Sequence, residues 1–344
     1  MATVAKRKKV STFQFEDLPV EISIKVMRYL DITDLVRFTR VSKRIRALGQ
    51  DESLWQKVDL SWKRVSYSFV QFVLEKKCKH LILHGTILIG KTQLLIGNTL
   101  KFTKICQLKH LDLGECEINE RVMNYLLSSC HNLESFSLEY LDLQPHTIKR
   151  ICLQNGKTLQ KLDLETETWN RQLQLESISD IVNHCSELTE LNLSQRHLPE
   201  DALRYLANNL SPKILKLSLG VCKNLRDEHV ETLVKRCNKI TELDLRSSYY
   251  LSNITLTNVI ENLKYTLEKL DLTCFWVRDL TKYYELKSMP KLKYLRMANL
   301  SNDEVVTLKN KLPNVKISRD FLTIAKFIVP PEKESMYDYI RLMR

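Results

Sequence analysis

Residues 85–92 have the composition and spacing of a phosphate-binding loop. They fit the pattern Gly-x-x-x-x-Gly-Lys-Ser/Thr, with Lys91 and Thr92 at the end, and they follow a candidate strand at residues 80–83. A loop of this kind binds phosphate because small, flexible residues turn their backbone N–H groups inward. Three of the four central residues are bulky here, so we expect them to pack against the protein. We therefore expect this segment to pack and to bind no cofactor. An NTP-binding enzyme is the third and least favoured of the functions considered for the chain.

Four aspartates stand where carboxylates could act as general acid and base. Asp112, Asp163, Asp244 and Asp271 each lie between the second and third apolar residues of a recurring leucine-rich phrase. If that phrase forms a strand, period-two alternation turns these side chains onto the open face of a sheet. The eight histidines are dispersed apart from His80 and His84, and no serine lies in a nucleophile elbow. We therefore predict a protein that is not an enzyme, with an aspartate ladder that serves either binding or solvation.

The nine cysteines could ligate zinc, but their spacing follows another rule. Cys130, Cys185 and Cys237 each lie three residues before the first apolar residue of a phrase, and Cys116 and Cys222 each lie three residues after the third. A repeating structure spreads such thiols out, whereas a metal site needs them to converge. We expect buried, reduced thiols and no metal site.

The elements that must position these residues repeat along the chain. The phrase Leu-x-x-Leu-x-Leu, with Ile, Phe or Met in places, recurs from Leu108 to Met297, and a weak first copy begins at Cys78. From Leu111 onward its second apolar residue recurs every 25 to 29 residues, which is the period of leucine-rich repeats. Helical patterns fill the intervals. The sequence therefore predicts an α/β fold, a curved leucine-rich-repeat solenoid with parallel strands on the concave face and helices on the convex face.

A different pattern occupies residues 14–60. Leu18 and Pro19 open it as a helix start, and apolar residues then recur at helical spacing in three short sets that end before Trp55. Thr33 offers an N-cap for the second set. Three short helices cannot bury all of these side chains among themselves, so we expect some of them to pack on something else.

Residues 14–60 resemble an F-box, the motif by which substrate receptors bind the Skp-type adaptor of cullin-RING ubiquitin ligases. The positions that match are Leu18, Pro19, Glu21, Val26, Leu30, Asp34, Leu35, Val41, Leu54 and Trp55, while Ser42 and Ile45 stand where Cys and Trp are usual. The resemblance implies adaptor binding by Leu18, Pro19, Glu21, Val26, Leu30, Leu35, Val41, Leu54 and Trp55, with Leu18, Leu30, Leu35 and Trp55 as exposed anchors. A helical subdomain with no partner is the alternative.

Leucine-rich repeats with this placement of cysteines resemble those of F-box/leucine-rich-repeat receptors, a family that includes the S-phase kinase-associated receptor. The two resemblances together cover residues 15 to about 317. They imply the substrate-recognition subunit of an SCF (Skp–cullin–F-box) ubiquitin ligase, which would act by proximity. A leucine-rich-repeat scaffold with no role in degradation is the alternative. The identity of the target stays open, as does any need for phosphorylation or an accessory subunit.

Five segments follow from these patterns. They are a flexible basic tail at 1–13, the F-box at 14–60, a linker helix at 61–77, the solenoid at 78–318 and a C-terminal tail or cap at 319–344. The last segment is too apolar for a simple disordered tail. In the resembling family such tails cap the solenoid or fold back along its concave face.

The predicted concave face has mixed charge, which suits a protein or peptide better than nucleic acid. The candidate target-binding residues are Asp112, Asp163, Asn192, Asp244, Arg246 and Asp271 on the strands, and Trp169, Tyr249, Tyr250, Phe275 and Trp276 in the loops after them. Binding energy concentrates on aromatic side chains, although each of these could equally be a packed loop residue.

Composition narrows the class of protein further. The chain has 44% hydrophobic and 27% charged residues, no apolar run that could span a membrane and no signal-peptide core. We therefore expect a cytoplasmic or nuclear protein with no membrane partner. The net charge of +12 comes partly from Lys6 to Lys9, a candidate nuclear-import signal, and the rest is scattered, so we expect no nucleic-acid partner.

Overall fold

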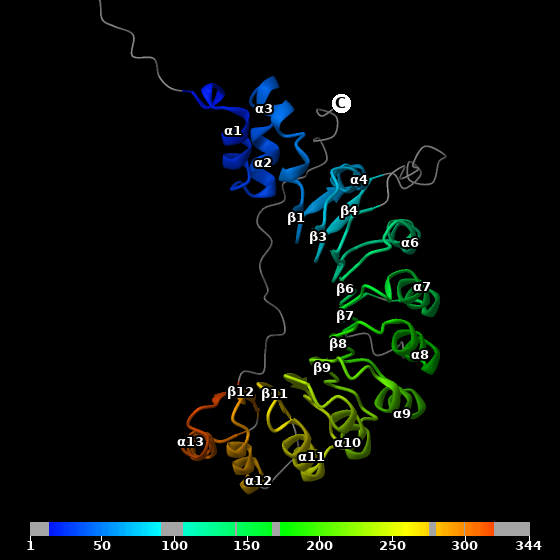
Figure 1. Ribbon diagram of the computed structural model, residues 1–344, viewed down its shortest axis with the longest axis vertical. Coiled ribbons are helices and arrows are strands. Elements are labelled where there is room, and N and C mark those ends of the chain that lie inside the picture. The colour runs from blue at the N-terminus through cyan, green and yellow to red at the C-terminus, as the bar shows by residue number, and fades with distance from the viewer. Residues whose placement is uncertain are drawn as a thin grey trace, which may run out of the picture.

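The computed structural model describes residues 14–90, 106–141, 143–166, 173–274, 280–298 and 300–319. These residues form an N-terminal helical module and a curved solenoid, with the sheet on the inner side of the arc and the helices on its outer side (Figure 1). The predicted fold class is confirmed. Predicted residues outside the described ranges are Lys91, Thr92, Trp169, Phe275 and Trp276, together with Lys6 to Lys9 and the tail beyond residue 319.

Local signals fix the helical module. It consists of a turn η1 (Phe15–Asp17), α1 (Val20–Met27), α2 (Ile32–Phe38), α3 (Lys43–Leu48) and a turn η2 (Glu52–Leu54). Pro19 stands just before α1, where its missing N–H costs nothing. The N-cap of α2 is Asp31 and not the predicted Thr33, because the helix begins at Ile32 and the Asp31 carboxylate accepts the Asp34 N–H at 2.8 Å.

The helical module and the solenoid share strands and a core. Strand β1 (Lys57–Asp59) pairs in parallel with β3 (His80–Ile82), so the sheet begins before α4 (Tyr67–Glu75). A two-stranded sheet consists of β2 (Arg64–Ser66) and β4 (Ile87–Ile89). Trp55 is fully buried and packs edge-on against Phe69 and Phe72, with ring centroids 6.1 and 4.8 Å away. The module is therefore joined to the first repeat by direct packing.

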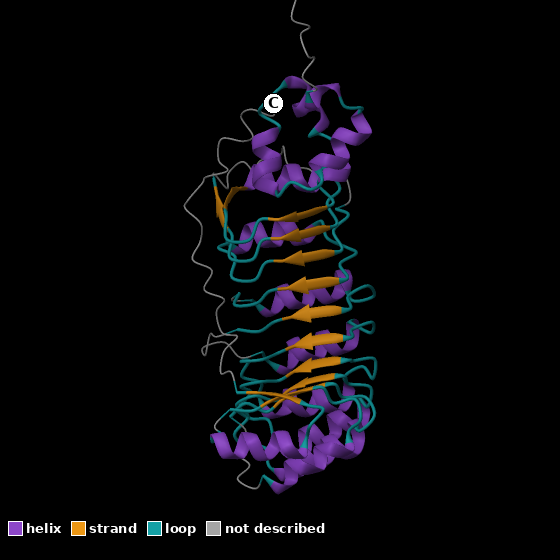
Figure 2. Ribbon diagram, turned by 90° about the vertical axis from the view of Figure 1, so that its left-hand side faces the viewer, coloured by secondary structure: helices purple, strands orange, loops and turns teal. Residues whose placement is uncertain are grey.

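Within the described chain, eleven parallel strands form one sheet, in the order β1-β3-β5-β6-β7-β8-β9-β10-β11-β12-β13. The later strands are β5 (His110–Asp112), β6 (Ser135–Ser137), β7 (Lys161–Asp163), β8 (Glu190–Asn192), β9 (Lys216–Ser218), β10 (Glu242–Asp244), β11 (Lys269–Asp271), β12 (Tyr294–Arg296) and β13 (Lys316–Ser318). Figure 2 shows them stacked across the concave face.

Helices return the chain along the convex face from one strand to the next. They are α6 (Glu120–Ser128), α7 (Pro145–Asn155), α8 (Leu175–His184), α9 (Glu200–Asn209), α10 (Asp227–Arg236), α11 (Asn253–Leu263), α12 (Thr281–Tyr284) with η3 (Glu285–Ser288), and α13 (Asn302–Lys311). No helix in the described ranges has the length and apolar character needed to cross a membrane.

One apolar core runs through the solenoid because every repeat contributes the same positions. Each strand buries its central side chain, as where Leu162 pairs with Leu191, and its outer residues face the concave side. The leucines before and after a strand, such as Leu159 and Leu164, are also buried. No repeat could bury these leucines alone, so stacking creates the core. The nine cysteines are free thiols, and all except Cys274 are buried.

The described part of the phosphate-loop pattern, residues 85–90, is a packed turn and strand. Gly85 lies in the left-handed region at φ 61°, and a Cβ there would come within 2.3 Å of the Trp62 ring. The backbone N–H groups of Gly85, Thr86 and Ile87 donate to backbone carbonyls at 2.8 to 3.0 Å. Three of the backbone N–H groups of this pattern are therefore already engaged within the fold. The prediction that these residues pack is confirmed for the described part of the segment.

Candidate binding surfaces

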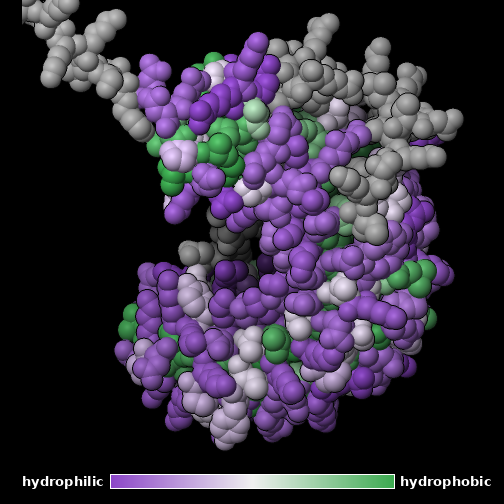
Figure 3. Space-filling model, turned by 45° about the horizontal axis from the view of Figure 1, so that its top comes forward, coloured by the Kyte–Doolittle hydropathy of each residue, from purple (hydrophilic) through white to green (hydrophobic). Residues whose placement is uncertain are grey.

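The first candidate surface is an apolar stripe on the helical module. Ile22, Val26 and Tyr29 follow one another at i, i+4 and i+7, so they share one face of α1 and its end. Their exposed fractions are 43%, 44% and 86%, and Val41 after α2 is 69% exposed. Figure 3 shows hydrophobic patches at the end of the molecule that carries these helices, beside a mainly hydrophilic solenoid surface. We call Ile22, Val26 and Tyr29 the apolar stripe.

Three residues predicted to face the adaptor belong to the core instead. Leu35, Leu54 and Trp55 are 3%, 8% and 0% exposed. The Trp55 indole also donates a hydrogen bond from Nε1 to the Gly49 carbonyl at 2.8 Å. Trp55 is buried because it packs on Phe69 and Phe72 of α4, a contact that the pattern of the module alone does not reveal. Leu35 and Leu54 lie in the same apolar core. The prediction of Leu35 and Trp55 as exposed anchors is therefore wrong, and Leu54 is likewise buried.

The other predicted adaptor residues are accessible to different degrees. Pro19, Glu21 and Val26 are exposed, whereas Leu18 and Leu30 are half-buried. The Leu18 carbonyl accepts a hydrogen bond from Arg44 Nη2 at 2.7 Å, which ties the start of α1 to α3. The structure thus presents α1 as the more accessible part of the predicted adaptor site, and the role of these residues stays a prediction.

The second candidate surface is the concave face of the sheet. A groove of about 460 Å³ lies there, lined by residues from β6 to β12. At the start of the strands, Lys161, Glu190, Lys216, Glu242 and Lys269 alternate in charge from one strand to the next. Successive Nζ–Oε1 distances are 2.8, 3.5, 3.5 and 3.1 Å. This row, which we call the charge ladder, is therefore a continuous series of internal ion pairs.

The aspartates at the strand ends form turns. The Oδ1 atoms of Asp112, Asp163, Asn192, Asp244 and Asp271 each accept the backbone N–H two residues later, at 2.8 to 3.0 Å. Such a bond closes the turn after the strand, as side chains of Asp and Asn commonly do. Binding and solvation are the predicted alternatives for these side chains. Closing the turn is therefore a third role, and it occupies one oxygen of each side chain.

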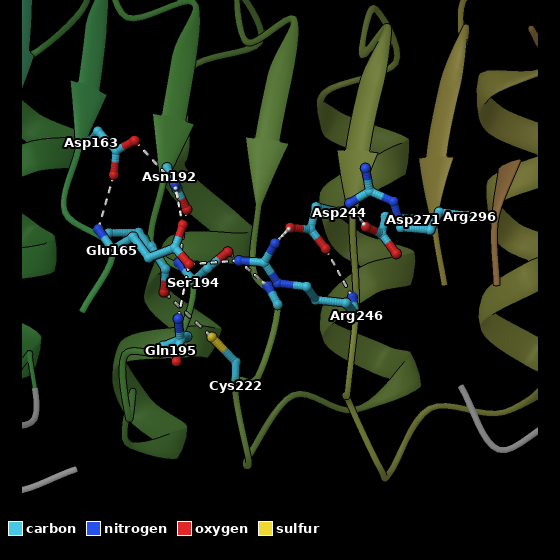
Figure 4. A network of polar contacts seen from close by, with 12 residues as sticks. Asp163, Glu165, Asn192, Ser194, Gln195, Cys222, Asp244, Arg246, Asp271 and Arg296 are labelled. Atoms are coloured by element: carbon cyan, nitrogen blue, oxygen red, sulfur yellow. Dashed lines mark hydrogen bonds and ion pairs between the residues drawn. The ribbon is translucent and has the colours of Figure 1, made fainter. Parts of the chain in front are cut away.

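A network of polar contacts crosses the middle of the groove (Figure 4). Arg246 extends from the end of β10 toward the repeat of β7, where its Nη2 lies 2.6 Å from Glu165 Oε1. Gln195 and Asn192 donate to the same carboxylate at 2.9 and 3.0 Å. The arginine lies over Gly220, where a Cβ would come within 2.5 Å of Arg246 Cγ. Glycine at this position therefore allows the Glu165–Arg246 ion pair, which we call the clasp.

Burial and mutual repulsion shift the pKa values of the concave carboxylates upward. Burial raises the pKa of Asp244 to about 6, against the opposing charge of Arg246. Burial, together with the charges of Asp163 and Glu165, raises the pKa of Glu139 to about 7. Burial raises the pKa of Asp163 as well. Burial is thus the largest cause of all three shifts, and for Glu139 the negative charges of Asp163 and Glu165 add to it.

Two of the predicted loop aromatics lie in the described chain. Tyr249 and Tyr250, after β10, are 55% and 58% exposed. The Arg226 guanidinium lies over the Tyr250 ring, 4.9 Å from its centroid. Both rings are accessible to a partner beside the concave groove, as their prediction as anchors requires.

The sequence prediction omits two parts of the concave surface. Glu165 is missing from the candidates although it holds Arg246, and the charge ladder is missing as a unit. The alternation of Lys and Glu at one repeat position is the signal that could have identified the ladder. No local pattern could have paired Glu165 with Arg246, because 81 residues separate them.

One cluster between α9 and α10 has the composition of a metal site. Glu200, Glu228 and His229 place ligand atoms within 4.8 Å of one another. His229 Nδ1 accepts the Arg226 N–H at 3.2 Å, so Nε2 carries the proton that it shares with Glu200 Oε1 at 3.1 Å. Both imidazole nitrogens are engaged, and a hydrogen-bonded, buried histidine accounts for the cluster.

Comparison with known proteins gives two family models that match the chain. The model described as the SKP2 LRR domain matches residues 76–339, and the model described as F-box-like matches residues 15–61. F-box/LRR-repeat protein 4 from Bos taurus is 24% identical over 254 residues, which cover 71% of this chain and 40% of that protein. The chain therefore spans less than half the length of this curated relative.

Solved structures with a similar chain include the yeast Rad7 and Elc1 complex. The match has 17% sequence identity, a TM-score of 0.44 and 92% coverage of each chain. Internalin C2 from Listeria monocytogenes matches with 13% identity and a TM-score of 0.27, over 78% of this chain and 84% of that one.

Proposed function

Since the chain belongs to the F-box/leucine-rich-repeat proteins, we propose that it is the substrate-recognition subunit of an SCF-type ubiquitin ligase. The combination of an F-box with leucine-rich repeats supports a substrate receptor, and such proteins are generally non-catalytic adaptors. In this proposal the helical module binds a Skp-type adaptor, and through it a cullin-RING ligase. The solenoid binds a protein target.

The apolar stripe is the observation that carries the proposal. Ile22, Val26 and Tyr29 expose apolar surface on a module whose other large apolar side chains mostly lie in the core. Burying such surface stabilises an interface by about 25 cal/mol per Å². Glu21 and Lys25, which are exposed and charged, stand beside the stripe and would supply the polar rim of a protein interface.

The joint between the module and the solenoid suits a receptor that acts by proximity. Trp55 packs on α4, and β1 continues the sheet of the repeats, so the fold itself fixes the two surfaces relative to each other. A receptor of this kind needs no reactive group of its own, because holding a target near the ligase raises its effective concentration. We also propose a cytoplasmic or nuclear location, where the free thiols would stay reduced.

The test is capture of a purified Skp-type adaptor by the full chain. Ile22→Asp combined with Val26→Asp places two charges in the apolar stripe, and we expect affinity to fall about a hundredfold or more. Leu153→Asp is the matched control, since it changes another apolar side chain, 59% exposed, on α7. Adaptor binding by the double variant at wild-type strength would refute the proposal.

A second readout separates a ligase receptor from a scaffold. Proteins captured by the chain in proteasome-inhibited cells are identified by mass spectrometry, with the double variant as the comparison. We expect at least one captured protein to carry ubiquitin only when the apolar stripe is intact. Captured partners that are never ubiquitylated would favour the scaffold.

A further inference from the structure

Charge is unevenly distributed across the width of the concave face. The charge ladder at the start of the strands pairs internally. The opposite edge of the face consists of the last residue of each strand from β5 to β12 and the described residues among the three that follow it. This row includes seven carboxylates and two arginines, which gives a formal charge of −5. They are Asp112, Glu115, Glu139, Asp163, Glu165, Asp244 and Asp271, with Arg246 and Arg296. We call this row the acidic rim.

Ion pairs neutralise the part of the acidic rim nearest the C-terminus. Arg246 forms the clasp with Glu165, and its Nη1 lies 3.5 Å from Asp244 Oδ2. Arg296 Nη1 lies 3.0 Å from Asp271 Oδ2. Every carboxylate from β10 to β12 in this row therefore has a guanidinium partner.

The middle of the acidic rim differs from its two sides. The Glu139 carboxylate has no hydrogen bond or ion pair with any described residue, although its charge acts on its neighbours. Asp163 is held by the Asn192 amide at 3.1 Å and by the Glu165 backbone N–H at 3.0 Å, neither of which carries a charge. Glu139 and Asp163 therefore form an acidic position for which the described chain supplies no ion-pair partner.

Two glycines let basic side chains approach this position from both directions. A Cβ on Gly114 would come within 2.6 Å of His84 Nδ1, as a Cβ on Gly220 would meet Arg246. The His84 ring nitrogens each lie 3.7 Å from a carboxylate oxygen of the β5 repeat. Basic side chains thus face the acidic rim at its β5 end and beyond β8, while β6 and β7 between them present carboxylates.

We propose that the acidic rim at Glu139 and Asp163 binds a lysine or arginine side chain from an extended, basic segment of the protein that the repeats capture. This rests on the proposed role of the solenoid as the target-binding module, and it adds the chemistry of the target. A cation here would continue the ion-pair pattern that the clasp and His84 establish on either side. A guanidinium suits the position well, because its several N–H donors can bridge neighbouring carboxylates.

The charge of this position favours a basic protein segment over an acidic segment, a nucleic acid or a divalent cation. An acidic or phosphorylated segment, or a nucleic acid, would meet repulsion from Glu139 and Asp163. A divalent cation needs several oxygen ligands, and Asp163 already commits Oδ1 to the turn and Oδ2 to Asn192. A groove of about 460 Å³, lined by Asp163 among the described residues, lies beside this position and offers room for an extended segment.

A basic probe tests the position, and the net charge of +12 on the whole chain disfavours its non-specific attraction. The probe is a fluorescein-labelled peptide of eight residues that alternate arginine and glycine. Its binding to the full chain is measured by fluorescence anisotropy at neutral to alkaline pH and low salt. Adaptor capture is measured on the same preparations, so that failure of the proposed function shows separately.

We expect Glu139→Gln with Asp163→Asn to weaken peptide binding about tenfold, because two of the interacting charges are lost. Asn keeps the acceptor that closes the turn, as Asn192 does in the next repeat. Glu139→Gln alone removes no bond within the described chain and should weaken binding about threefold. Glu231→Gln on α10 removes the same charge from the convex face and should have no effect.

The outcome separates the two proposals. Equal peptide affinity for the wild type and the double variant, or equal weakening by Glu231→Gln, overturns the inference even if the adaptor still binds. Loss of adaptor capture by the wild type would refute the F-box role and leave the charge measurement valid.

Discussion

The two candidate surfaces differ in how far the protein satisfies its own side chains. The apolar stripe leaves much of Ile22 and Val26 and most of Tyr29 in water, and burying an apolar side chain away from water is favourable. On the concave face, most charged side chains find partners in the next repeat, as in the charge ladder and the clasp. All three residues of the apolar stripe therefore need another molecule to cover them. The groove should owe its selectivity to the few groups that repeat stacking leaves without a partner.

Removing the joint between the surfaces should have the largest effect. Trp55→Ala leaves a cavity beside Phe69 and Phe72 and removes the bond to the Gly49 carbonyl. Truncating a buried aromatic residue costs about 3–5 kcal/mol of unfolding free energy. We expect the helical module to unfold at a lower temperature than the solenoid, which circular dichroism would record as two transitions.

Tyr29→Ala is the matched control for that prediction. It truncates an aromatic side chain that is 86% exposed, so the melting temperature should not change while adaptor capture weakens. If Trp55→Ala melts in one transition at the wild-type temperature, the joint does not depend on this residue. The fixed geometry between the two surfaces would then need another explanation.

Breaking the internal pairing of the concave face should have an intermediate effect. Gly220→Ala pushes a Cβ against Arg246 Cγ and forces the arginine away from Glu165. Overpacking of this kind typically costs about 1–3 kcal/mol. The measurement is urea-induced unfolding, and the reason for the loss is tested by repeating the change in an Arg246→Ala background.

The double variant decides whether the clasp is the cause. If the clasp carries the effect, Gly220→Ala should cost less once the arginine side chain is gone, because the two closest contacts of the new Cβ, Arg246 Cγ and Nε, are then absent. If the two substitutions lower the unfolding free energy additively, Gly220 matters for a reason other than the clasp. The stability of the concave face would then depend less on the Glu165–Arg246 pair than the geometry indicates.

The solenoid could be predicted because its information is local and repeated. Leucines at a fixed offset and a period of 25 to 29 residues identify the strands, and alternation alone places Asp163 or Asp244 on the open face. The same alternation cannot tell that these aspartates also close the turns after their strands. That role depends on a backbone N–H two residues away, which any aspartate at this position would meet.

Contacts between distant segments account for what the sequence did not reveal. An F-box pattern marks Trp55 as important, but only the packing of α4 decides that the ring faces inward. The clasp joins residues 81 positions apart and depends on the glycine in the repeat between them. The apolar stripe is easier to predict from the sequence, because helical spacing alone places Ile22, Val26 and Tyr29 on one face.

The smallest expected effect sharpens the comparison most, because it tests Glu139, whose carboxylate has no partner among the residues that the structure describes. The pKa of Glu139 is about 7 in the folded chain against an ordinary value of 4.5, owing first to burial and then to Asp163 and Glu165. Folding therefore favours the protonated form, and Glu139 lowers stability as pH rises from 4.5 through 7, with the loss complete above pH 7. The charges of His84 and Asp112 also act on this carboxylate, but they are the same in the wild type and in a variant at position 139.

Glu139→Gln should thus raise the melting temperature slightly near pH 8 and leave it unchanged near pH 4, where both side chains are uncharged. The shift should be a few degrees at most, because water reaches part of this side chain. Glu134→Gln is the control of opposite sign: the Lys109 ammonium that donates to Glu134 lowers the pKa of this carboxyl, so its stabilisation exists above the unfolded pKa and is lost on acidification. That variant should melt slightly lower near pH 8. If both variants shift in the same direction there, Glu139 is paired in solution, and the concave face satisfies its charges throughout.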